Sequence, residues 1–79
     1  MSRQMAIDLN KTDIAILTEL SEGRCTPSYL ENQTNFTRQA IQGRLTVLRA
    51  ADYVEKIDTG LYEITDAGRS ALTDTSAPE

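Results

Sequence analysis

The amino-acid sequence predicts a small α+β domain that is mainly helical, and three observations lead to this prediction. Apolar residues follow the spacing of one helical face at Ile14, Leu17 and Leu20, and again at Ile41, Leu45 and Leu48. After residue 52 the spacing changes, and two short runs rich in β-branched and aromatic residues flank a turn at residues 58–60. Between these patterns, residues 34–49 contain three bases and no acid, although the formal net charge of the chain is −4.

The composition excludes several kinds of function. The 79 residues include one cysteine, Cys25, and no histidine, so an internal disulfide, a Cys-based zinc site and a histidine general base are excluded. The acids are scattered without a paired pattern, and a chain this short leaves little volume for a pocket beside its core. We therefore expect no enzymatic activity, no metal, no cofactor and no small-molecule ligand. Cys25 is expected to pack as a small apolar residue, with a redox role as the alternative.

The chain length indicates one domain. We expect a lead-in at residues 1–9, a folded domain at residues 10–72 and a disordered tail at residues 73–79. No apolar run approaches the ~20 residues that span a bilayer, and the N-terminus lacks the apolar segment of a signal peptide. These features predict a cytoplasmic protein with no membrane partner.

The first helix begins after Asn10, whose side chain can cap it. Asp13 follows three residues later and suits the positive end of a helix, while Leu9 and Ile14 occupy hydrophobic-staple positions. This helix is expected to run to about Ser21.

A short second helix is predicted at residues 27–33. Thr26 and Pro27 form a strong start signal, with threonine as the cap and proline in the first helical position. Cys25 is then expected to lie in a short extended piece before this helix.

The third helix follows a tight turn at residues 34–36 and is capped by Thr37. Its polar face, opposite the apolar stripe, consists of Arg38, Gln39, Gln42, Gly43, Thr46 and Arg49. A glycine inside a helix costs ~1 kcal/mol relative to alanine. Gly43 therefore indicates either a close approach of the backbone to a ligand or mere tolerance.

The last third of the chain predicts a β-hairpin and a fourth helix. Residues 53–57 and 61–64 are short strand-forming runs around a three-residue loop that ends in glycine. Thr65 and Asp66 then begin a helix with the sequence TDAGRSAL. The expected order is helix, short strand, helix, helix, β-hairpin, helix.

This order is that of a winged helix-turn-helix domain, in which the second helix of the motif enters the DNA major groove and the hairpin reaches a neighbouring backbone or groove. The acid-free segment falls on the reading helix, and Arg, Gln and Thr side chains donate hydrogen bonds to phosphates and base edges. We therefore predict double-stranded DNA as the partner. The predicted contacts are Thr37, Arg38, Gln39, Gln42, Gly43, Arg44 and Thr46 in the third helix, and Lys56 and Thr59 in the wing. For Arg44, an ion pair with an acid of another helix is an equal alternative.

Four motifs carry a resemblance to a known family. They are TPSYL and TRQAI at the starts of the second and third helices, LRAADYVEKI before the turn of the hairpin, and GLYEITDAGRSAL at the end of the domain. Over residues 8–72 the chain resembles small haloarchaeal winged-helix regulators similar to the repressor of halophage phi-H. The resemblance implies a transcriptional regulator, and it matches Thr37, Arg38, Gln39, Gln42 and Arg44 to DNA-facing positions. The chain departs at Asp52, where such proteins often carry glycine, and at a wing tip without Arg or Lys, which leaves Lys56 as the nearby cation.

We predict a sequence-specific transcriptional regulator, and a repressor in particular. Twelve acids against eight bases, of which six are arginine, suggest the acidic proteome of a halophilic archaeon. The rival interpretation is a winged helix that binds a protein partner and never contacts DNA. A scaffold of that kind has no reason to keep one helix free of acids, which favours DNA.

A homodimer is also expected. One reading helix covers only a few base pairs, which is too little to select one site in a genome. Apolar Met5, Ile7 and Leu9 favour a dimer contact built from the N-terminal segment and the first helix, with the fourth helix as the second choice.

Overall fold

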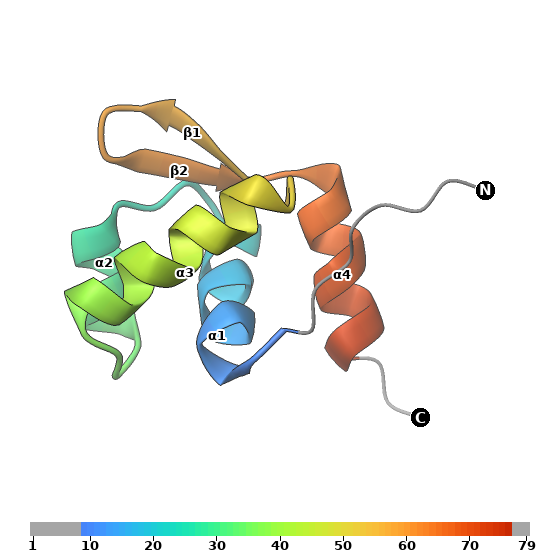
Figure 1. Cartoon of the computed structure of the whole chain (residues 1–79), viewed down its shortest axis with the longest axis horizontal. Helices are drawn as coiled ribbons and strands as arrows, with labels where there is room; N and C mark the ends of the chain where they lie inside the picture. Colours follow the sequence, from blue (N-terminus) through green and yellow to red (C-terminus); the bar gives the residue numbers. More distant parts are fainter. Residues whose placement is uncertain (1–8, 77–79) are drawn as a thin grey trace.

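The computed structural model describes residues 9–76. Its elements, in chain order, are α1 (Lys11–Ser21), α2 (Pro27–Gln33), α3 (Arg38–Ala50), β1 (Val54–Asp58), β2 (Leu61–Ile64) and α4 (Asp66–Ser76). The described fold is mainly helical, with one antiparallel hairpin after the third helix, which confirms the predicted winged helix (Figure 1). None of the helices within residues 9–76 has the length and apolar character needed to cross a membrane.

The predicted domain ends differ from the observed elements on one side. Helix α4 continues to Ser76, four residues beyond the expected end of the domain at residue 72. Residues 1–8, which include Met5 and Ile7, and residues 77–79 of the expected tail lie outside the described residues. The domain boundaries therefore stay a prediction.

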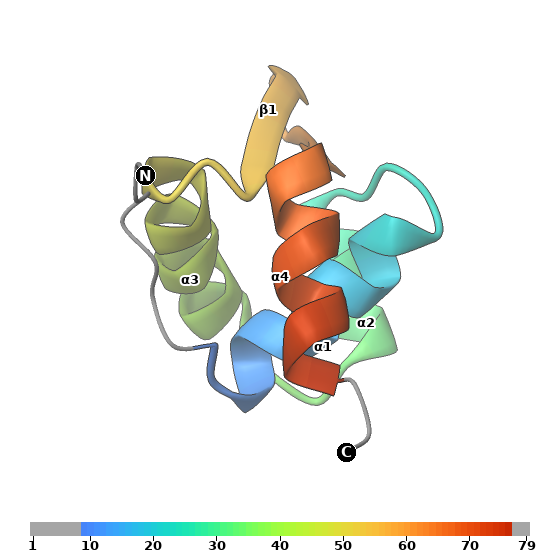
Figure 2. The same ribbon diagram turned by 90° about the vertical axis from the view of Figure 1, so that its right-hand side faces the viewer.

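Helix α1 lies at the centre of the domain, where it packs against α2, α3, α4 and β2. Figure 2 shows α4 in front of α1, which it contacts, and α3 to one side, with the hairpin at one end of the molecule. The core cluster consists of Ile16, Leu17, Leu20, Cys25, Leu30, Ile41, Leu45, Leu48, Val54, Tyr62 and Ile64. The apolar stripe predicted for the third helix is therefore buried as expected.

The start of α1 confirms the predicted cap, but its buried face is rotated. Asn10 Oδ1 accepts a hydrogen bond from the Asp13 N–H at 2.8 Å, and Asp13 Oδ2 accepts one from the Asn10 N–H at 3.0 Å, which completes a capping box. The buried residues of the helix are Asp13, Ile16, Leu17 and Leu20, whereas Ile14 is only partly buried. A carboxylate therefore occupies a position on the core face.

Cys25 joins the wing to the helical core. Its backbone N–H donates to the Tyr62 carbonyl at 3.0 Å, and the Tyr62 N–H donates back at 2.9 Å. This pair confirms the extended piece predicted at Cys25, as an isolated antiparallel bridge beside β2.

The hairpin starts one residue later than predicted. Tyr53 was expected in the first strand, but its N–H donates to the Leu48 carbonyl at 2.9 Å and so closes the end of α3. Strand β1 then extends to Asp58, and the pairing shifts register between Lys56 and Asp58, as in a β-bulge.

The end of α3 explains why a glycine suits position 52. The Asp52 N–H donates to the Arg49 carbonyl at 2.9 Å, and together with the bond from Tyr53 to Leu48 this forms a Schellman motif. That motif needs a residue in the left-handed region, and Asp52 has a φ of 70°. Aspartate tolerates this conformation better than most residues, but glycine adopts it without steric cost.

Helix α4 is held tightly against the end of α3. The Thr65 hydroxyl accepts a hydrogen bond from the Gly68 N–H at 3.0 Å and so caps α4. The same hydroxyl donates to the Asp52 carbonyl at 2.7 Å, which links the start of α4 to the segment between α3 and β1. A Cβ atom at Gly68 would collide with the backbone carbonyl oxygen of Tyr53. This approach requires glycine at residue 68.

Candidate nucleic-acid interface

One face of α3 is exposed and carries most of the predicted contact residues. Arg38, Gln39, Gln42, Gly43 and Thr46 are all exposed on this helix. The face contains no acidic residue, and apart from Gly43 its side chains are hydrogen-bond donors of the kind that contact base edges and phosphates. We call these five residues the α3 polar face.

Two threonine hydroxyls near this face also serve the helix itself. Thr37 Oγ1 accepts a hydrogen bond from the Ala40 N–H at 3.1 Å, which confirms Thr37 as the cap of α3. The Thr46 hydroxyl donates to the Gln42 carbonyl one turn earlier at 3.1 Å. The cap fixes the position of the first turn of α3, where contact with a groove is expected.

Gly43 lies in open space on this face. A Cβ built at Gly43 would have no heavy atom within 4 Å. Packing within the chain therefore does not require glycine at this position, in contrast to Gly68.

Arg44 forms an ion pair with a buried acid of α1. Its Nε donates to Asp13 Oδ1 at 2.7 Å and its Nη2 donates to Asp13 Oδ2 at 2.9 Å, while the Asp13 side chain is fully buried. The hydrogen bonding of the Arg44 guanidinium to the Asp13 carboxylate raises the pKa of Arg44 above its usual value, so this group stays charged. Of the two alternatives for Arg44, the pair with an acid of another helix is the one present in the structure.

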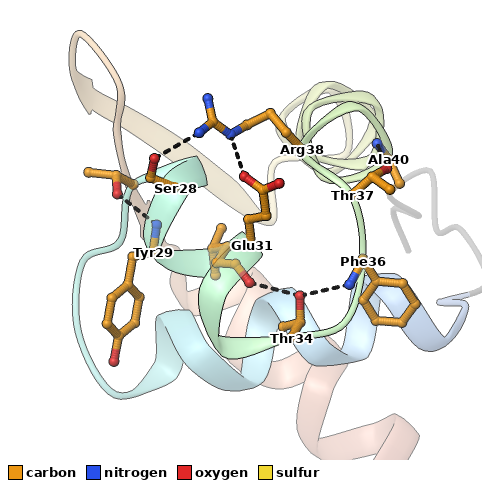
Figure 3. Close-up of polar contacts among 10 residues, drawn as sticks. Ser28, Tyr29, Glu31, Thr34, Phe36, Thr37, Arg38 and Ala40 are labelled. Carbon is orange, nitrogen blue, oxygen red and sulfur yellow. Dashed lines mark hydrogen bonds and ion pairs between the residues drawn. The ribbon is translucent and has the colours of Figure 1, made fainter.

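Arg38 projects from the first turn of α3 towards α2. Its Nε donates to Glu31 Oε1 at 3.1 Å, and its Nη2 donates to the Ser28 hydroxyl at 2.8 Å (Figure 3). Sequence reasoning missed both partners, because they lie on a different helix. The acid-free helix α3 therefore has an acid of α2 beside its first arginine.

The wing differs from the α3 polar face in charge. Lys56 and Thr59 are exposed, as a DNA contact requires, but the hairpin also carries Glu55, Asp58 and Glu63. The Thr59 N–H donates to Asp58 Oδ1 at 2.7 Å, which keeps a carboxylate at the turn. Acids at these positions weaken the attraction of the wing for phosphates.

Cys25 has the properties of a packed, protonated thiol. It is buried, and its Sγ lies 3.4 Å from the Gly23 carbonyl oxygen. Burial raises the pKa of the thiol, and the neighbouring Glu19 and Glu22 raise it further. A thiol rather than a thiolate at neutral pH favours the packing role over the redox role. Within residues 9–76, no group of three His, Cys, Asp or Glu side chains could hold a metal ion.

Comparisons with known proteins found a matching family and a similar solved structure. A profile of the MarR family matches residues 7–60 of the chain. The fold is similar to the crystal structure of the transcriptional regulator BldR from Sulfolobus solfataricus, with a TM-score of 0.76 and 29% identity, over 84% of this chain and 52% of that chain. The chain thus spans about half the length of this relative. A search of curated proteins gave no significant match.

These findings bear on two of the expectations from the sequence. The family match and the likeness to a solved transcriptional regulator bear out the expectation that the chain is not an enzyme. The closer resemblance to haloarchaeal regulators of the phi-H type stays a prediction.

Proposed function

The chain belongs to the MarR family, and on that premise we propose that it is a sequence-specific DNA-binding regulator that reads the major groove with α3. The observation that carries this proposal is the α3 polar face, which is exposed, free of acids and located on the second helix of a helix-turn-helix. Double-stranded DNA is the partner that such a face fits best.

The residues of the interface are proposed to have different roles. Arg38, Gln39 and Gln42 are proposed to contact base edges, since their side chains are long donors near the start of the helix. Thr46 and the open backbone at Gly43 would then lie along the groove, and Thr37 would set the angle of entry through its cap. Arg44 is proposed to act indirectly, because its guanidinium anchors α3 to α1 through Asp13.

The negative net charge of the chain supports a protein that works in the cytoplasm of a halophilic organism. The formal net charge is −4, which opposes diffuse attraction to DNA in dilute salt. At 1 M salt the Debye length is ~3 Å, so this long-range repulsion is largely screened. Binding would then depend on short-range contacts of the α3 polar face, and we propose a haloarchaeal cytoplasm as the location.

Repression is the mode of regulation that we propose. A winged helix that reads a promoter site with α3 would occupy that site, so the simplest mechanism is occlusion of the promoter by the bound protein. Lys56 and Thr59 would contribute a minor wing contact beside the α3 polar face.

Replacement of Gln39 or Arg38 by alanine is expected to weaken binding to a selected DNA site by ~1–3 kcal/mol each, because each removes base-edge hydrogen bonds. Fluorescence anisotropy with a labelled duplex measures this loss. Arg69→Ala is the matched control, since it removes an exposed arginine from α4 rather than from α3. Unchanged affinity in both α3 variants, with folding confirmed by circular dichroism, would favour the protein-binding alternative.

The protein is expected to bind its site as a homodimer, because paired reading helices on half-sites one helical turn apart supply the missing sequence information. The proposed contact combines the N-terminal segment with α1, and α4 is the second choice. Sedimentation at tens of micromolar in high salt measures the mass of the free protein. A species of 8.8 kDa that binds a site without two-fold symmetry would contradict the dimer.

A further inference from the structure

The contact between α2 and α3 at Arg38 has a geometry that bears on which base is read. Arg38 is the first residue of α3, and both of its side-chain acceptors, Glu31 and Ser28, belong to α2. The side chains of Arg38 and Glu31 are 49% and 40% exposed, so the contact lies at the surface. Pairs this exposed contribute ~0–1 kcal/mol to stability. The fold therefore has little need of this contact.

The contact uses only one edge of the guanidinium. An arginine has five N–H groups in a planar fork. The Nε–H and one N–H of Nη2 point to α2, which leaves three N–H groups, on Nη1 and Nη2, for another acceptor. Figure 3 shows one terminal nitrogen of Arg38 directed away from α2. The edge formed by the two terminal nitrogens, Nη1 and Nη2, which we call the end-on edge, is thus directed away from α2.

An end-on edge with two parallel donors matches one base in particular. Guanine presents two acceptors, O6 and N7, to the major groove, and a bidentate arginine is the commonest contact to it. Adenine presents a donor beside its N7, which opposes an arginine. A guanidinium fixed with this edge outwards therefore selects guanine.

We propose that Glu31 and Ser28 are positioning residues, which hold Arg38 by its side edge so that its end-on edge reads a guanine. This inference rests on the proposed reading of the major groove by α3. A free arginine loses considerable rotamer freedom when it binds a base, and a side chain that is already held loses less. The carboxylate of Glu31 also repels phosphates, so its presence lowers affinity for unrelated DNA while it sharpens the choice of base.

The test compares binding to a selected site with binding to duplexes in which each base pair is changed singly. Wild type is expected to prefer guanine at one position by about tenfold or more, and Arg38→Ala is expected to lose that preference there. Glu31→Ala should reduce the preference several-fold at the same position only, while its affinity for random DNA rises. Glu31→Gln should retain more of the preference, because the amide oxygen still accepts from Nε.

Matched controls separate positioning from simple charge removal. Glu22→Ala removes an exposed acid at the end of α1. It should leave the preference for each base at every position of the site unchanged. Equal melting temperatures of wild type and Glu31→Ala would show that the effect does not come from unfolding.

Three results would overturn the inference. Full preference for guanine in Glu31→Ala, with loss in Arg38→Ala, would show that Arg38 reads the base without help from α2. An equal loss at every position in Glu31→Ala would show a general effect on the fold or charge. A wild-type protein that discriminates at no base pair would overturn both this inference and the proposed function.

Discussion

Replacement of Arg44 by methionine is expected to destabilise the fold by about 3–5 kcal/mol, because it leaves the carboxylate of Asp13 buried without its partner. Asp13 is fully buried, and both of its oxygens accept hydrogen bonds from Arg44, at 2.7 and 2.9 Å. Small domains have a free energy of unfolding of about 5–15 kcal/mol, so a loss of this size affects a large share of the total. Urea denaturation followed by circular dichroism measures it.

Arg49→Met is the matched control for this change, since Arg49 is an exposed arginine of the same helix. We expect it to alter stability by ~0.5 kcal/mol or less. The double replacement of Asp13 by leucine and Arg44 by methionine should recover much of the loss, because an apolar pair leaves no buried charge. A single Arg44→Met variant as stable as wild type would contradict the assigned role of the ion pair.

Replacement of Leu45 by alanine is expected to cost about 2–5 kcal/mol, because Leu45 lies in the core cluster between the two other buried residues of α3. The alanine would leave a cavity at the junction of α3 with the helices that it packs against. Thermal unfolding measures the effect as a lower melting temperature.

Gln42→Ala is the control for Leu45, since it shortens an exposed side chain on the same helix. Its melting temperature should stay close to that of wild type. If Leu45→Ala also melted within a degree or two of wild type, the buried face of α3 would not be the one described.

Local signals in the sequence were sufficient to predict the helices and their starts. Asn10, Thr26 and Thr37 each cap a helix as expected, because a cap depends only on residues within one turn of it. The change of spacing after residue 52 likewise predicted the hairpin, with an error of one residue at its start.

The side-chain pairs around the candidate interface could not be predicted in the same way. Arg44 and Asp13 are 31 residues apart, and Arg38 and Glu31 belong to different helices, so both pairs depend on how the helices pack. The sequence contained one signal for Asp13. This residue lies three and four residues before Ile16 and Leu17, which places it on the buried face of α1. A carboxylate in that register indicates a buried ion pair, and it leaves the identity of the partner open.

The suitability of glycine was visible in the sequence at position 52 but not at position 68. Asp52 stood out because a glycine is common there in the resembled family, and the structure gives it a positive φ. Gly68 gave no comparable signal. Glycine is required there because a Cβ atom would collide with the backbone carbonyl oxygen of Tyr53, which is distant in the sequence.

The central claim, that α3 reads DNA, is tested most directly by nuclear magnetic resonance. Amide signals of the labelled protein would be followed while a selected duplex is added at high salt. The largest changes are expected at residues 37–46, with smaller changes at Lys56 and Thr59 and little change in α4. Large changes confined to α1 or α4, with the signals of α3 unmoved, would contradict the claim.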